Sequence, residues 1–125
     1  MKDLIVLEYN TKDTELIDKI KKENSKEIWS FQEEEEVTDL LRRNYPEFEN
    51  NFVTTNLEKK ILLLENHFDR VYLHNNIKEE RFNKVLEVIY FYLKENGYLY
   101  ITRKINETLF LYKRKEQEYY LYQKR

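Results

Sequence analysis

Short apolar segments alternate with segments of helical spacing along this chain, and that alternation limits its fold more than any other feature. The apolar runs predict four buried strands, at Leu4 to Glu8, Lys26 to Phe31, Phe52 to Thr55 and Phe68 to Leu73. Amphipathic helices are predicted between them, one beginning after a capping residue at Asp13 or Thr14 and another near Val37. Because strands that are joined by helices run in the same direction, the pattern predicts a parallel sheet.

The clearest helical pattern runs from about Glu79 to Asn96. Its apolar residues form one stripe, made of Phe82, Val85, Leu86, Ile89 and Leu93. The only glycine of the chain, Gly97, follows directly. Glycine is the residue that most often adopts the left-handed conformation beyond the last turn of a helix, so we predict that conformation for Gly97.

Three strand-like segments follow, at Tyr98 to Thr102, Thr108 to Tyr112 and Glu118 to Tyr122. The links between them, Lys104 to Glu107 and Arg114 to Gln117, are so short that we expect antiparallel hairpins. The predicted fold class is therefore α/β, with a mostly parallel sheet that ends in an antiparallel β-meander.

Composition restricts the class of protein further. The chain has 125 residues, a net charge of -2 and no cysteine, which predicts one domain over residues 1–125 in a reducing compartment such as the cytoplasm. No apolar run approaches the ~20 residues of a membrane span, so we expect no membrane association. The two histidines, His67 and His74, lack the spacing of metal ligands, and we expect no metal site.

Several of these segments carry a family resemblance. Phe68 to Asn76, the helix that ends Tyr92-Leu93-Lys94-Glu95-Asn96-Gly97, and Tyr98 to Ile101 resemble the fourth strand, following helix and fifth strand of the class I S-adenosylmethionine-dependent methyltransferases. The family pattern there is F-D-x-V, a helix, then L-K-x-G-G-x-L-x-I. Val6-Leu7-Glu8 resembles the V-L-E or V-L-D that opens the family's first loop, and Val37 to Pro46 resembles its second helix. The resemblance covers nearly the whole chain and implies a Rossmann-like three-layer α/β/α fold.

The cofactor-binding positions of that family depart from its pattern. Its G-x-G-x-G loop after the first strand aligns with Asn10, Lys12 and Thr14, and a glycine-free loop keeps the backbone farther from a cofactor. The family's ribose-binding acid at the end of the second strand is Gln32 here, and its adenine-contacting acid is Asn56.

Of the family's acids only Glu8 is retained, and the side chain of Lys12 is expected to lie where the cofactor would bind. The resemblance therefore implies a degenerate site, and we expect no cofactor. S-adenosylmethionine, if it binds, is expected to contact Glu8, Asn10, Gln32 and Asn56.

The family also has residues before the first strand and a helix between its fifth and sixth strands. Met1 to Asp3 and Lys104 to Glu107 are too short to supply either, so we expect an uncovered face on the last strands. Apolar side chains alternate onto that face. We predict that Phe110, Tyr112, Tyr120 and Tyr122 form an interface with a protein partner.

Three functional hypotheses follow. The first is a non-catalytic methyltransferase-like domain that acts by protein binding, as a homodimer or as the partner subunit of an active enzyme. The second is a minimal S-adenosylmethionine-dependent methyltransferase, in which His74 is the candidate for chemistry. The third is an RNA-binding module, because the segment beyond Gly97 holds six of the eleven tyrosines and seven lysines or arginines.

Overall fold

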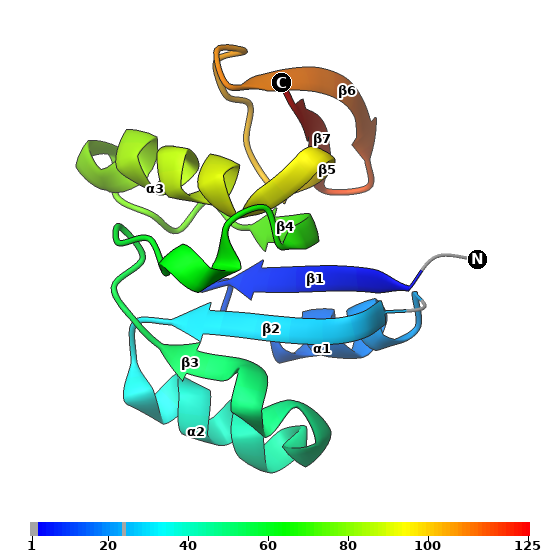
Figure 1. Ribbon diagram of the computed structural model, residues 1–125, viewed down its shortest axis with the longest axis vertical. Helices are drawn as coiled ribbons and strands as arrows, with labels where there is room; N and C mark the ends of the chain where they lie inside the picture. Colours follow the sequence, from blue (N-terminus) through cyan, green and yellow to red (C-terminus); the bar gives the residue numbers. More distant parts are fainter. Residues whose placement is uncertain (1–2, 24) are drawn as a thin grey trace.

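The computed structural model describes residues 3–23 and 25–125 (Figure 1). Met1 and Lys2, which belong to the segment predicted to be too short for a covering element, lie outside the described residues. The strands are β1 (Leu4–Tyr9), β2 (Ser25–Gln32), β3 (Phe52–Thr54), β4 (Phe68–Leu73), β5 (Leu93–Ile101), β6 (Phe110–Glu116) and β7 (Tyr119–Lys124). The helices are α1 (Thr14–Lys21), α2 (Glu35–Asn44) and α3 (Glu79–Tyr92), with short 3-10 helices η1 (Pro46–Asn51) and η2 (Leu62–Leu64).

The seven strands form one sheet in the order β3-β2-β1-β4-β5-β7-β6. Strands β1 to β5 are parallel to one another, and β7 is antiparallel to both of its neighbours. The predicted α/β class, with a mostly parallel sheet and antiparallel pairing at its carboxyl-terminal end, is confirmed.

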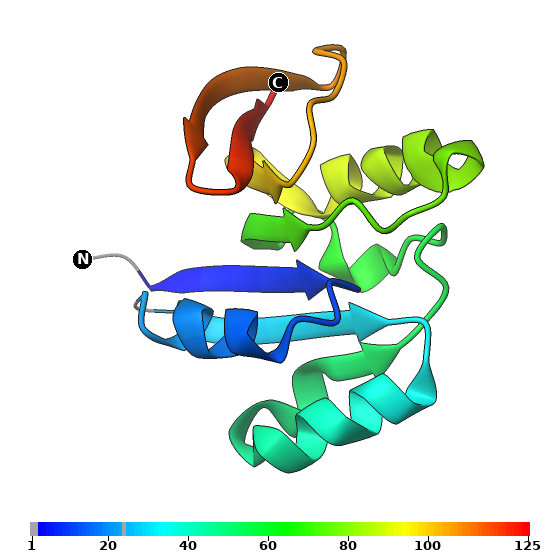
Figure 2. The same cartoon turned by 180° about the vertical axis from the view of Figure 1, so that it is seen from behind.

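Helices cover both faces of the sheet, which gives the predicted three layers. Successive residues of a strand point to opposite faces, and β1 accordingly places Val6 in the core cluster of α1 and α2 and Leu7 in the cluster of α3. Figure 2, the view from behind, shows α1 in front of β1 and β2. The predicted cap of α1 is Asp13, whose Oδ1 accepts hydrogen bonds from the backbone N–H groups of Glu15 and Leu16 at 3.0 and 3.3 Å.

The order of the last three strands differs from a meander, because β7 lies between β5 and β6. Residues 102–109 join β5 to β6, which begins at Phe110 rather than at the predicted Thr108. Eight residues can cross the width of one intervening strand, since neighbouring strands are spaced about 4.8 Å apart. As predicted, this connection contains no helix.

Helix α3 ends at Tyr92, before the predicted end at Asn96. Sheet pairing ends it early, because the carbonyls of Phe91 and Tyr92 already accept hydrogen bonds from the chain entering β4, and Leu93 pairs with Phe68. The left-handed conformation predicted for Gly97 is found instead at Asn96, with φ 65°. Gly97 is needed for a close approach: a Cβ there would lie 2.9 Å from the carbonyl oxygen of Lys94.

Two of the four predicted interface residues are part of the chain's own core. Phe110 and Tyr122 are 1% and 2% exposed, while Tyr112 and Tyr120 remain accessible at the surface. The connection 102–109 covers the sheet where the absent helix would lie: Ile105 packs against the core, and its backbone N–H donates to the hydroxyl of Tyr122 at 2.9 Å. A partner could therefore contact Tyr112 and Tyr120 but not the two buried rings.

Candidate functional site

The carboxyl ends of β1 and β2 meet around Glu8, the single acidic residue of β1. Its carboxylate is buried, and Oε1 accepts hydrogen bonds from Ser30 Oγ at 2.5 Å and from Gln32 Nε2 at 2.7 Å, while Oε2 accepts one from the backbone N–H of Thr11 at 2.5 Å. Burial raises the pKa of Glu8 because it disfavours the charged form, and these hydrogen bonds oppose that rise only in part. Glu8 thus holds the β1–α1 loop against β2.

Gln32 points into the interior rather than toward a ligand. The side chain is fully buried, and Nε2 donates to Glu8 and to Ser30 Oγ, the latter at 2.8 Å. Its Oε1 is the one buried side-chain polar atom among the described residues that lacks a hydrogen-bond partner. In this position the amide is bonded to side chains of β1 and β2 rather than exposed at the surface.

The loop after β1 keeps a left-handed backbone although it contains no glycine. Asn10 has φ 53° and Lys12 has φ 61°, and both align with glycines of the family pattern. Asparagine tolerates this conformation, but a lysine in it is strained by its Cβ. The Asn10 side-chain oxygen accepts from the backbone N–H of Glu33 at 3.2 Å, and its carbonyl accepts from Asn76 Nδ2 at 2.9 Å. The loop is therefore held in its shape by neighbouring chain segments.

The side chain of Lys12 reaches the loop that follows β2. It is about half exposed, and its ammonium forms an ion pair with Glu34, the residue just before α2. The positive φ of Lys12 turns its side chain toward that neighbouring loop. Thr14, the third aligned position, is the first residue of α1, and its side chain lies outside the described part of the chain.

We expect Lys12→Gly to be more stable than Lys12→Ala by about 1 kcal/mol, because glycine adopts a φ of 61° without the Cβ penalty. Both variants lose the ion pair with Glu34, so the comparison isolates the backbone. The midpoint of urea unfolding measures the difference. Equal midpoints would show that the loop relaxes out of the left-handed conformation at no cost.

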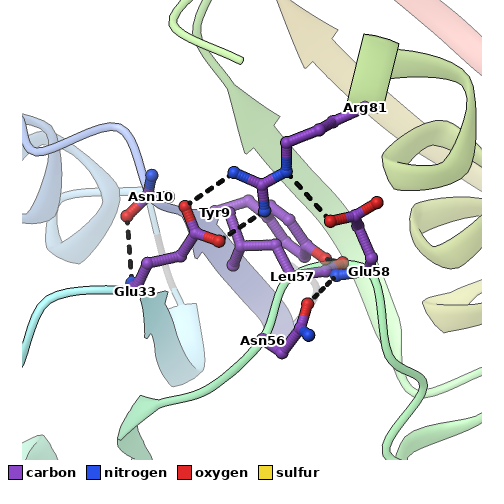
Figure 3. A network of polar contacts seen from close by, with 7 residues as sticks. All are labelled: Tyr9, Asn10, Glu33, Asn56, Leu57, Glu58 and Arg81. Carbon is purple, nitrogen blue, oxygen red and sulfur yellow. Dashed lines mark hydrogen bonds and ion pairs between the residues drawn. The ribbon is translucent and has the colours of Figure 1, made fainter. Parts of the chain in front are cut away.

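Arg81, in the first turn of α3, forms ion pairs with two acidic residues from different loops (Figure 3). Its guanidinium pairs bidentately with Glu33, with Nη1 donating to Oε1 at 3.1 Å, and its Nε donates to Glu58 at 3.0 Å. These two carboxylates raise its pKa further above the usual value for arginine. These ion pairs connect α3 to the β2–α2 loop and to the segment after β3.

The sequence contained a signal for Arg81 that pattern reasoning missed. A cation in the first turn of a helix is disfavoured by the helix dipole, so its presence indicates nearby carboxylates. Glu33 and Glu58 are distant in sequence, and only the folded sheet brings them to Arg81.

Asn56 and the end of β1 complete this network. The side-chain oxygen of Asn56 accepts from the backbone N–H of Glu58 at 2.8 Å, which forms a local turn (Figure 3). The hydroxyl of Tyr9 donates to the carbonyl of Leu57. The predicted adenine-contacting side chain therefore stabilises its own loop.

His74 and the two asparagines after it form hydrogen bonds with different parts of the chain. His74 Nε2 lies 2.7 Å from the hydroxyl of Tyr119 on β7, and burial lowers the pKa of His74, which favours the neutral ring. The backbone N–H of Asn75 donates to Thr102 Oγ1 at 2.8 Å, whereas Asn76 is bonded to Asn10. The structure does not bring these three side chains together as one reactive cluster.

Neither a metal site nor a membrane-spanning helix is found in the described residues. Across residues 3–23 and 25–125, no three His, Asp or Glu side chains are grouped so that they could hold a metal ion. Within the same residues, no helix is long and apolar enough to cross a bilayer.

The sequence matches no protein-family model and no curated protein. Solved structures do share its fold. One from Haemophilus influenzae, described as a candidate methylase, has a TM-score of 0.75 and 16% identity over 98% of this chain and 87% of its own. A methyltransferase from Aquifex aeolicus, described as dependent on S-adenosylmethionine, has a TM-score of 0.73 and 15% identity over 99% of this chain and 84% of its own.

Identity this low shows the fold and not the activity. Part of a protein from Rhodobacter sphaeroides, described as a candidate zinc-dependent alcohol dehydrogenase, also aligns, with a TM-score of 0.71 and 14% identity over 86% of this chain and 44% of its own. The Haemophilus influenzae and Aquifex aeolicus structures are instead matched over 87% and 84% of their own length. This chain therefore has the fold of the class I S-adenosylmethionine-dependent methyltransferases.

Proposed function

We propose that the chain is a non-catalytic methyltransferase-like domain that acts by binding a protein. One observation carries the proposal: the side chains at the candidate cofactor positions are bonded to one another. Glu8 and Gln32 are buried and hydrogen-bonded to each other, and Arg81 pairs with both Glu33 and Glu58. A cofactor would meet side chains that are already bonded to one another, with Gln32 Oε1 as the one buried polar atom left without a partner among the described residues.

To bind here, S-adenosylmethionine would have to displace an existing side-chain ion pair. A nearby carboxylate that could accept hydrogen bonds from ribose hydroxyls is Glu33, and both of its oxygens already face the guanidinium of Arg81. Separating this bidentate pair loses two charge-assisted hydrogen bonds and leaves Arg81 paired with Glu58 alone. Each 1.4 kcal/mol of that cost weakens binding about tenfold. The residues present do not fit the cofactor.

A specific observation favours the alternative of a minimal methyltransferase. Asn10 and Lys12 retain the left-handed backbone at positions aligned with the family's glycines. The backbone N–H groups of Asn10, Thr11 and Asp13 already donate within the chain, so the left-handed backbone alone favours this alternative. The RNA-binding alternative stays a prediction, supported by Tyr112 and the exposed cations Lys113 and Lys115 on β6.

Isothermal titration with S-adenosylmethionine and S-adenosylhomocysteine separates the first two functions. We expect no binding heat from either compound up to about 1 mM, which corresponds to less than about 4 kcal/mol of binding free energy. Micromolar binding would overturn the proposal and favour the minimal enzyme.

Two arginine variants test the reason for the absent binding. Arg81→Met keeps the aliphatic stem but frees Glu33 and Glu58, so it is expected to bind more tightly than the unmodified chain. Arg103→Met is the control, because Arg103 pairs with the exposed Glu79 away from this network. Equal heats from both variants would show that Arg81 does not close the site.

A further inference from the structure

Two adjacent leucines of η2 are the most exposed large apolar side chains among the described residues. Leu62 is 75% exposed and Leu63 is 93% exposed, while the next residue, Leu64, is buried. The segment is held in place, because the backbone N–H of Ile61 donates to the hydroxyl of Tyr92 at 2.9 Å and that of Asn66 donates to the carbonyl of Phe91 at 3.0 Å. A well-anchored segment thus presents two leucines to solvent.

A groove of about 430 Å³ lies beside the chain segment that carries these leucines. Its apolar wall consists of Tyr90 and Phe91 from the end of α3 and Leu109 from the connection that precedes β6. Lys60 and Glu65, which flank η2 in the chain, also line it. The protruding leucines and the groove therefore belong to one continuous surface, which we call the η2–α3 surface.

We propose that the η2–α3 surface binds a second copy of this chain about a two-fold axis, with Leu62 and Leu63 of each copy in the groove of the other. The inference rests on the proposed function, because it names the protein partner. A two-fold dimer requires a self-complementary patch, in which the protruding and the receiving parts lie on the same surface. The η2–α3 surface meets that requirement.

The charges around the groove also fit a second copy. Its lining includes two cations, Lys60 and Lys124, and two anions, Glu65 and Glu87. Two copies of such a surface have no net charge to repel one another, and a two-fold rotation can place the cations of one beside the anions of the other.

The β6 edge of the sheet is poorly suited to self-association. Strand β6 carries Lys113, Arg114 and Lys115 in succession, and antiparallel pairing of two such edges would bring like charges together. The backbone N–H of Tyr112 is already bonded to Glu107 at 2.9 Å, and the ladder is irregular between Tyr112 and Arg114. Pairing through β6 is therefore disfavoured.

The test is the mass of the full chain in solution, measured by sedimentation equilibrium over a wide range of concentrations. We expect a mass approaching twice the 15.7 kDa of one chain. In the double variant Leu62→Ser/Leu63→Ser the dimer dissociation constant is expected to rise at least about 30-fold, since central apolar contacts dominate interfaces. Both leucines are exposed, so the variant should retain the urea unfolding midpoint that the unmodified chain has at concentrations where it is monomeric.

Leu111→Ser is the matched control, because Leu111 is an exposed leucine on β6, outside the η2–α3 surface. It should leave the mass unchanged. A monomer at every concentration would overturn the inference, and so would a dimer that Leu111→Ser dissociates and the double variant does not. Heat with S-adenosylmethionine would refute the non-catalytic proposal whatever the mass, whereas a monomer that gives no heat would refute self-association alone.

Discussion

Replacement of Phe110 by alanine is expected to lower the free energy of unfolding by about 3–5 kcal/mol. Phe110 is fully enclosed: it packs with the α3 core, and its ring lies edge-to-face with Tyr90 at a centroid distance of 5.8 Å. Alanine would leave a cavity that the surrounding strands cannot close. Such a loss is a large part of the 5–15 kcal/mol that stabilises a typical domain.

Tyr112→Ala is the matched control for Phe110→Ala. Both residues lie on the same face of β6, but Tyr112 is 41% exposed. Its loss should cost about 1 kcal/mol or less. Urea unfolding followed by far-ultraviolet circular dichroism measures both changes. Similar midpoints for the two variants would show that the end of the sheet is loosely packed and that Phe110 is free to meet a partner.

The parallel part of the fold could be predicted because each local signal agreed with the global arrangement. The strand predicted at Phe68 to Leu73 coincides with β4, and Asp13 caps α1 as expected. The strand order at the other end could not be predicted in the same way. Strand β6 begins at Phe110, two residues later than predicted. The link that was predicted to form a hairpin is therefore a longer connection that crosses β7.

The position of the site could be predicted, but the partners within it could not. Glu8, Asn10 and Gln32 do lie together at the carboxyl edge, as the resemblance implied. Their orientation depends on distant residues: Arg81 reaches Glu33 and Glu58 only after α3 has packed across the sheet. Burial of Phe110 by the connection before β6 is likewise a tertiary effect that strand alternation does not reveal.

The second large effect concerns pH and the buried carboxyl group of Glu8. Burial, and to a smaller extent Asp13, raises the pKa of Glu8 above 4.5 in the folded chain. An acid whose folded pKa is raised contributes stability that is fully present below its unfolded pKa and is lost as pH rises through its folded pKa. Ionised Glu8 is therefore expected to destabilise the fold as the solution becomes more alkaline.

Glu8→Gln should remove that dependence. A glutamine is neutral at every pH, and its oxygen can still accept from Ser30, Gln32 or Thr11. As pH rises above about 4.5, we expect the free energy of unfolding of the variant to increase relative to that of the unmodified chain. The increase is up to about 1.4 kcal/mol per pH unit until the pKa of Glu8 in the folded chain is passed. Urea unfolding of both proteins from pH 5 to about pH 8 measures the difference.

Other groups with shifted pKa values cancel in this comparison, because both proteins contain them. Burial lowers the pKa of His74, for example. The contribution of His74 to the free energy of unfolding is therefore lost as pH falls, and this loss is the same in the variant and in the unmodified chain. Glu15→Gln, at an exposed position in the first turn of α1, is the control and should follow the unmodified chain. Parallel curves for all three proteins would mean that Glu8 is ionised throughout and that water reaches the network around it. A closed network, which the proposed function requires, would then be excluded.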